Sequence, residues 1–71
     1  MNKYLINTKS IEDLKPEHKM ILSIKGALKE IESNPEQEPF FAALIVATID
    51  KLKEEYGLTK DEIFKYKFNF I

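Results

Sequence analysis

The chain has 71 residues, with eleven lysines, no arginine and twelve acidic residues, for a formal net charge of -1. This length allows one domain, spanning residues 1–71, and the charge balance argues against a dedicated nucleic-acid-binding domain, which usually carries a basic excess and uses arginine. The absence of cysteine excludes disulfide bonds and thiolate metal sites. Because so small a domain buries only about 60% of its unfolded surface, self-association is the remaining common source of added stability.

The sequence shows no segment typical of membrane insertion or export. No apolar run reaches the roughly 20 residues that span a bilayer, and the opening MNKYLINTKS lacks the apolar centre of a signal peptide. We therefore expect a cytoplasmic protein that makes no membrane contact. Abundant lysine, isoleucine, asparagine and phenylalanine without arginine is typical of small proteins from AT-rich bacteria or their phages.

The first fifteen residues give only local signals. A short apolar cluster at Tyr4–Ile6 fits either an extended arm or a short strand. The pattern S-x-x-D at Ser10–Asp13 approximates a capping box and predicts a helical turn at 11–14. Pro16 argues against continuing that helix, because it would delete an internal hydrogen bond, and it fits instead as the first residue of a new helix.

A long helix is predicted over residues 16–33. Met20, Ile24, Ala27, Leu28 and Ile31 fall on one stripe at helical spacing, with Ile21 at its margin. The opposite side, which we call the lysine face, is defined by Lys15, Lys19, Leu22, Lys25 and Lys29. No acidic residue interrupts the centre of this face.

A second long helix is predicted over residues 39–56. The segment SNPEQE forms a turn before it, and Pro39 fits a helix start. So short a connection makes the two long helices antiparallel neighbours. From Phe40 to Ile49 only Thr48 is polar, so this half of the helix is apolar nearly all round, as in a buried helix. Gly57 is the expected left-handed terminator.

The last fifteen residues fit two structures. T-x-x-E at Thr59–Glu62 is a capping box that starts a helix, and a helical stripe extends to the C-terminus. The aromatic residues also alternate with polar ones from Phe64 to Phe70, as in a strand. We predict helix throughout, and so an all-α bundle of two long antiparallel helices with shorter terminal elements. The alternative is an α+β fold, with a helical turn at 60–65 and a strand at 66–70 that pairs with residues 3–7.

No catalytic or metal constellation stands out. His18 is the only histidine, and it is interpreted as a solvated side chain in the first helical turn. Asp50 and Glu54 lie one turn apart, a spacing that usually marks an exposed, mildly repulsive pair rather than a catalytic one. The acidic turn around Glu36 lacks the ligand spacing of a calcium loop. We therefore expect no enzymatic activity, no metal and no cofactor.

Two surfaces are candidates for partner binding. The first is the lysine face, which suits an acidic protein or a phosphate backbone. The second consists of the C-terminal aromatic residues, a type enriched at interface hot spots: Tyr66, Phe68 and Phe70. The leading hypothesis is a non-enzymatic protein–protein interaction module, such as a small bacterial or phage regulator, adaptor or inhibitor. The alternative is a nucleic-acid-associated protein that uses the lysine face.

Self-association is predicted through one side of the second helix. We call this side the alanine face and define it by Phe40, Ala43, Val46 and Ala47. Its small side chains let another backbone approach closely, and two-fold packing is the commonest way to bury such a face. The sequence therefore predicts a homodimer with Ala43 and Ala47 near its axis. The competing hypothesis is that Tyr4–Ile6 folds over this face and keeps the chain monomeric.

Overall fold

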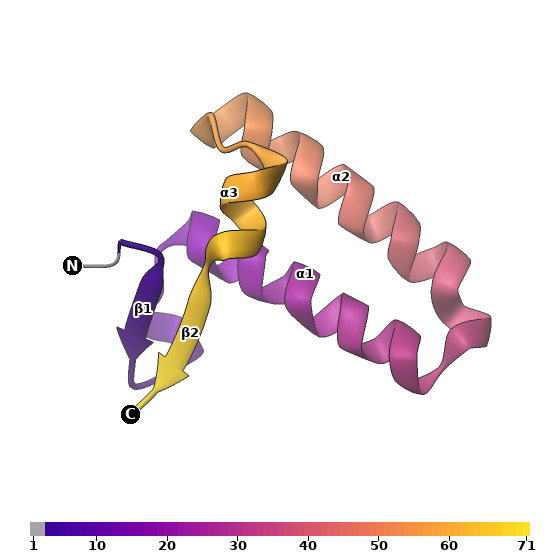
Figure 1. Ribbon diagram of the computed structural model, residues 1–71, viewed down its shortest axis with the longest axis horizontal. Coiled ribbons are helices and arrows are strands. Elements are labelled where there is room, and N and C mark those ends of the chain that lie inside the picture. The colour runs from indigo at the N-terminus through magenta and orange to yellow at the C-terminus, as the bar shows by residue number, and fades with distance from the viewer. Residues whose placement is uncertain (1–2) are drawn as a thin grey trace.

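The computed structural model describes residues 3–71 as two long helices beside a small sheet (Figure 1). The chain forms, in order, β1 (Leu5–Thr8), η1 (Ile11–Asp13), α1 (Pro16–Ser33), η2 (Pro35–Gln37), α2 (Glu38–Tyr56), α3 (Lys60–Lys65) and β2 (Lys67–Phe70). After the turn at η2, α2 runs back alongside α1, and the sheet lies near the end where α1 begins. The molecule is elongated, measuring 38 × 28 × 20 Å.

Both long helices begin and end where local sequence signals place them. Proline lies in the first turn of each, and the bounds agree with the predicted 16–33 and 39–56 within one residue. Gly57 adopts a left-handed φ of 66°. It donates its N–H to the Lys53 carbonyl at 3.1 Å, while the Leu58 N–H reaches the Leu52 carbonyl at 3.3 Å. These two bonds satisfy carbonyls that the helix end would otherwise leave free.

The capping box predicted at Thr59 starts α3. The Thr59 side chain accepts the Glu62 N–H at 3.2 Å, and the Glu62 carboxylate accepts the Thr59 N–H, also at 3.2 Å. The hydrogen bonds from the backbone and side chain of Thr59 lower the pKa of Glu62, because they favour its charged form. This short helix therefore has a well-defined start despite its six residues.

The terminal segments form a parallel two-stranded sheet, so the alternative predicted for the chain ends is the one observed. Leu5 is paired with Lys67 and Thr8 with Phe70. The ladder is extended by bonds from the Lys67 N–H to the Tyr4 carbonyl (2.8 Å) and from the Ile71 N–H to the Thr8 carbonyl (2.9 Å). The prediction of helix to the C-terminus is wrong after Lys65, because alternating aromatic residues favour a strand once a partner strand is available.

The core lies where α1, α2 and α3 meet. Ile21, Ile24, Leu52 and Ile63 are each at most 2% exposed and form one cluster. Ile21, predicted at the margin of its stripe, is fully buried at the centre of this cluster, because Ile63 of α3 is packed there together with α2. Partly buried hydrophobic residues surround the cluster: Met20, Ile45, Ile49, Leu58, Tyr66 and Phe68. Toward η2, α1 and α2 extend away from the sheet as a helical hairpin (Figure 1).

Candidate functional site

The alanine face lies on the outside of α2. Phe40 is 65% exposed and Val46 59% exposed, and Ala43 and Ala47 are both exposed between them. The opposite side of the helix is turned to the core through Leu52, so the face is left uncovered by the elements that bury the rest of α2. Tyr4–Ile6 does not fold over it, since Leu5 and Ile6 belong to β1 and are paired with β2. The competing hypothesis of an N-terminal cover is therefore wrong.

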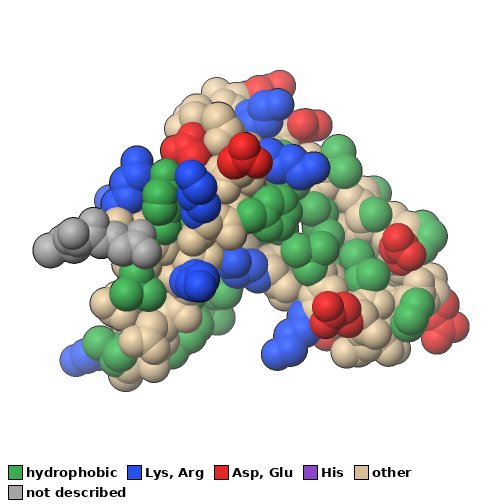
Figure 2. All heavy atoms as spheres, in the orientation of Figure 1, with side chains coloured by type: hydrophobic (Ala, Val, Ile, Leu, Met, Phe, Trp, Pro, Cys, Tyr) green, Lys and Arg blue, Asp and Glu red, His purple; other side chains and the backbone are tan. Residues whose placement is uncertain are grey.

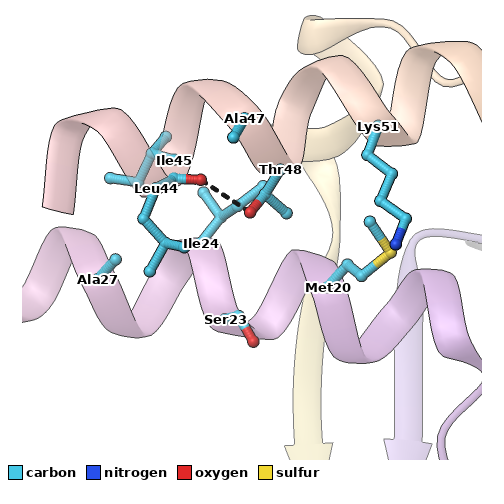
Figure 3. A pocket seen from close by; sticks show the side chains of 9 residues that line it. All are labelled: Met20, Ser23, Ile24, Ala27, Leu44, Ile45, Ala47, Thr48 and Lys51. Atoms are coloured by element: carbon cyan, nitrogen blue, oxygen red, sulfur yellow. Dashed lines mark hydrogen bonds between the residues drawn. The ribbon is translucent and has the colours of Figure 1, made fainter.

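A groove runs between α1 and α2 and shares Ala47 with the alanine face (Figure 3). It encloses about 350 Å³ and is lined by Met20, Ser23, Ile24, Ala27, Leu44, Ile45, Ala47, Thr48 and Lys51. Both hydroxyls of the lining are engaged within their own helices: Ser23 Oγ donates to the Lys19 carbonyl at 3.1 Å, and Thr48 Oγ1 donates to the Leu44 carbonyl at 2.8 Å. The groove therefore offers mainly apolar contact, apart from the charged side chain of Lys51 in its lining, and Leu44, which is 48% exposed, forms part of its rim.

The end of the helical hairpin is rich in acidic residues. Residues 30–50 include five acidic residues and no lysine, so all eleven lysines lie elsewhere in the chain. We call Glu30, Glu32, Glu36 and Glu38 the acidic tip, and all four are exposed. Asp50 is exposed too, but it lies twelve residues after Glu38 in α2 and outside the tip. Figure 2 shows acidic side chains near the hairpin end, with hydrophobic side chains between them. A chain with almost no net charge thus has one strongly negative end.

The lysine face lies along α1 and is accessible. Lys15, Lys19 and Lys29 are exposed, while Lys25 and Leu22 are half-buried. Within residues 3–71 none of these lysines has an acidic side chain within 4 Å, and the ion pair found there joins Lys51 and Glu55 on α2 at 3.8 Å. Four of the five residues predicted together lie in α1 and Lys15 immediately precedes it, although Leu22 is less exposed than an anchoring residue would need to be.

The C-terminal aromatic residues are divided between the core and the surface. Tyr66 and Phe68 pack against the core cluster. The Tyr66 ring also meets the Tyr4 ring edge-on, with centroids 5.1 Å apart. Phe70 is 49% exposed and Ile71 72% exposed at the end of β2. Of the three aromatic residues predicted to bind a partner, Phe70 is thus the one left largely accessible.

His18 is less solvated than predicted. It is half-buried, and its ring lies 5.3 Å from the Tyr66 ring and 6.3 Å from the Phe68 ring, centroid to centroid. Desolvation by this burial lowers the pKa of His18, with a smaller opposing effect from Glu17. The neighbouring rings give His18 a packing role at the junction of α1 and β2.

The described residues contain no group of three histidine or acidic side chains that could hold a metal ion. Between residues 3 and 71 no helix is both long and apolar enough to cross a bilayer. No family model, curated protein or solved structure matches the chain. The candidate binding surfaces among the described residues are therefore the alanine face, the groove next to it and the acidic tip.

Sequence reasoning identified the alanine face but missed the groove and the acidic tip. The groove depends on how α1 and α2 pack, which helical periodicity alone does not determine. The acidic tip had a signal, because a stretch of 21 residues without lysine is conspicuous in a chain with eleven lysines. The sequence analysis considered this turn only as a possible calcium loop and did not use the uneven distribution of lysine along the chain.

Proposed function

We propose that this chain is a non-enzymatic protein–protein interaction module that self-associates through the alanine face. The observation that carries the proposal is the exposure of Phe40 and Val46, 65% and 59%, on the most apolar helix of the chain. Exposed apolar surface of this kind marks interaction sites in soluble proteins. Small regulators, adaptors and inhibitors of bacteria and phages form the functional class that such a domain fits.

A two-fold axis near Ala43 and Ala47 suits the geometry of this face. Alanine side chains allow two copies of α2 to approach closely, and Phe40 and Val46 flank them on the same side of the helix. Burying apolar area contributes about 25 cal/mol per Å², which works against the repulsion between acidic residues that each copy carries near this face, such as Glu38 and Asp50. A second copy would also bring stability that a small core lacks.

The proposal is tested by thermal unfolding at several protein concentrations. The midpoint of a dimer rises with concentration, because association favours the folded state. We expect this dependence in the wild type and its loss in Ala47→Glu. Gly26→Glu introduces the same charge at an exposed site on α1 where an added Cβ meets no atom within 4 Å, so it should keep the dependence. A wild-type midpoint independent of concentration and unchanged in Ala47→Glu would refute self-association through this face.

The second candidate function is nucleic-acid association through the lysine face. It is favoured by one observation, namely that these lysines have no ion pair within the described residues. Phosphate contacts release counterions, so log affinity should fall linearly with log salt, at a slope of about 0.9 per neutralised phosphate. This candidate function is refuted if the chain does not bind duplex DNA at low salt. It is also refuted if the affinity for DNA does not change when salt is added.

A further inference from the structure

We infer that the edge of β2 that faces away from β1, which we call the free edge, accepts an extended segment of another protein as a third strand, with an acidic residue opposite Lys67. Within residues 3–71 the sheet has two strands, so this edge has no partner strand. Strand addition is a common mode of peptide recognition. The inference rests on the proposed protein-binding function, and it names a surface separate from the alanine face.

The register of the sheet determines which backbone groups point to the free edge. The N–H groups of Lys67 and Ile71 both donate to carbonyls of the β1 segment, so both point toward β1. Along a strand, residues two apart turn their backbone groups to the same side, and the residues between them turn theirs to the other side. The N–H and C=O groups of Phe68 and Phe70 therefore point away from β1. Two donors and two acceptors thus lie at strand spacing along the free edge.

This sheet is small and open for a parallel one. Parallel sheets usually have more strands and both faces covered. The outer face here consists of exposed residues: Leu5, Asn7, Lys67 and Asn69. At the end of β2, Phe70 is 49% exposed and Ile71 is 72% exposed. Figure 2 shows open space between the sheet and the end of the helical hairpin, on the side of β2 away from β1. A third strand therefore has access to the free edge and would cover apolar surface there.

The side chains of β2 select the sequence of the added strand. Phe68 packs against the core and Phe70 lies on the same side of the strand, so residues opposite them should be apolar. Lys67 and Asn69 lie on the outer side, and within residues 3–71 Lys67 has no acidic side chain within 4 Å. An acidic residue opposite Lys67 would form a cross-strand ion pair. Antiparallel pairing, the slightly more stable arrangement, then gives the order apolar, polar, apolar, acidic from the N-terminus of the segment.

A second copy of this chain does not supply such a segment from its sheet. The strands read LINT and KFNF, and neither contains an acidic residue. The stretches 3–10 and 63–71, which contain the two strands, include four lysines and no acidic residue. Two sheets joined edge to edge would therefore bring like charges together and leave Lys67 without an acidic partner. The occupant is a segment of a different protein, and the alanine face is left for self-association.

The test uses the full chain and four synthetic peptides. The parent peptide has valine at the two apolar positions, threonine at the polar position and glutamate at the acidic position. The second peptide has lysine in place of glutamate. The third is N-methylated at both valines, which removes the N–H groups that face β2, and the fourth is N-methylated at the threonine and the glutamate, whose N–H groups face away.

Peptide binding is measured by fluorescence anisotropy at low and high salt. We expect methylation at the valines to weaken binding about tenfold or more, because two hydrogen bonds are lost. Methylation at the other two positions should change it less than twofold. The lysine peptide should bind about two- to fivefold more weakly than the parent, and this difference should narrow as salt screens the charges.

Matched variants of the chain place the site. Phe70→Pro removes an N–H from the free edge, while Asn7→Pro removes one from the outer edge of β1, toward which Asn7 points in the same register. Phe70→Ala keeps the N–H and loses the ring, so Phe70→Pro should bind the parent peptide about three- to tenfold more weakly than Phe70→Ala does. Lys67→Glu should weaken binding about two- to fivefold. Asn7→Pro and Lys9→Glu, which reverses a charge just after β1, should change it less than twofold.

Amide hydrogen exchange followed by NMR gives an independent measurement and reports whether each variant keeps the sheet. In the free chain the amides of Lys67, Asn69 and Ile71 should be protected, while those of Phe68 and Phe70 should exchange faster, because they point to solvent. Adding the parent peptide should protect Phe68 and Phe70.

Four outcomes would overturn the inference. Equal effects of the two N-methylated peptides, or equal losses in Phe70→Pro and Asn7→Pro, would refute strand addition at the free edge. Equal binding of the glutamate and lysine peptides would refute the acidic partner. Loss of the concentration dependence of unfolding in Phe70→Pro would show that a second copy occupies this edge. Absence of binding by every peptide would refute the free edge as a binding site, and the Ala47→Glu comparison would still report on the alanine face independently.

Discussion

Truncating Leu52 should remove a large part of the stability of this domain. Leu52 is fully buried, and it belongs to the cluster in which α2 meets Ile21, Ile24 and Ile63 of the other helices. A buried Leu→Ala substitution costs about 2–5 kcal/mol, the lost transfer free energy plus the cavity left behind. We expect about 3 kcal/mol for Leu52→Ala, because three β-branched isoleucines are poorly able to collapse into the space. A chain of this length has about 4–11 kcal/mol in total.

The assay is urea unfolding at one fixed protein concentration, followed by circular dichroism. Leu52→Ala should lower the midpoint with little change in the slope m, because the unfolded surface is nearly the same. Leu28→Ala is the matched control, since Leu28 lies on a helix but is 41% exposed, and it should cost about 1 kcal/mol or less. A loss of under about 1 kcal/mol for Leu52→Ala, or equal losses for the two variants, would refute the placement of the core.

Three further predictions concern single positions. Gly26→Ala should raise the free energy of unfolding by about 0.5–1 kcal/mol, since Gly26 lies inside α1 with open space around an added Cβ; a lower urea midpoint would contradict this. Thr59→Ala should cost about 1 kcal/mol, because the side-chain cap is lost. It should raise the pKa of Glu62 only part of the way toward its ordinary value, as carboxyl NMR titration would show, because the backbone N–H of residue 59 still donates to the carboxylate. The lowered pKa of His18 means that the unfolded chain binds a proton at higher pH than the folded one, so stability should fall as pH drops through the ordinary value of 6.5 and level off below the folded pKa. His18→Phe should remove this part of the pH dependence, and an unchanged profile would show that another group causes it.

The predictable part of the fold is the part with local causes. Pro16, Pro39 and Gly57 act on the backbone of their own turns, and the Thr59–Glu62 box satisfies donors within one turn, so each works whatever surrounds it. The helix bounds follow from these residues almost to the residue.

The chain ends had no such local cause. Residues 64–71 fit both periods, and the choice between them depends on pairing with Leu5–Thr8, about 60 positions away in the chain. The burial of Ile21 is likewise a tertiary effect, since Ile63 arrives only when α3 folds back on α1 and α2. The spacing of apolar residues along one helix gives no information about non-local contacts of this kind.

Only part of the candidate site could be predicted from the sequence. The first half of α2 is apolar on all sides, and one neighbouring helix can cover only part of it. The exposure of Phe40 and Val46 could therefore be predicted from the short chain and the apolar pattern of this helix. The groove required the packed pair of helices. The acidic tip is visible in the sequence only as a stretch without lysine, and no motif marks it.

Sedimentation equilibrium of the unmodified chain tests the central claim most directly. Self-association through the alanine face predicts a species of twice the chain mass, in equilibrium with monomer and dominant at high micromolar concentration. The same measurement on Ala47→Glu should give the monomer mass throughout, and on Gly26→Glu the wild-type result, since that position lies on α1 in open space. A wild-type chain of monomer mass at high micromolar concentration would contradict the claim without reference to any variant.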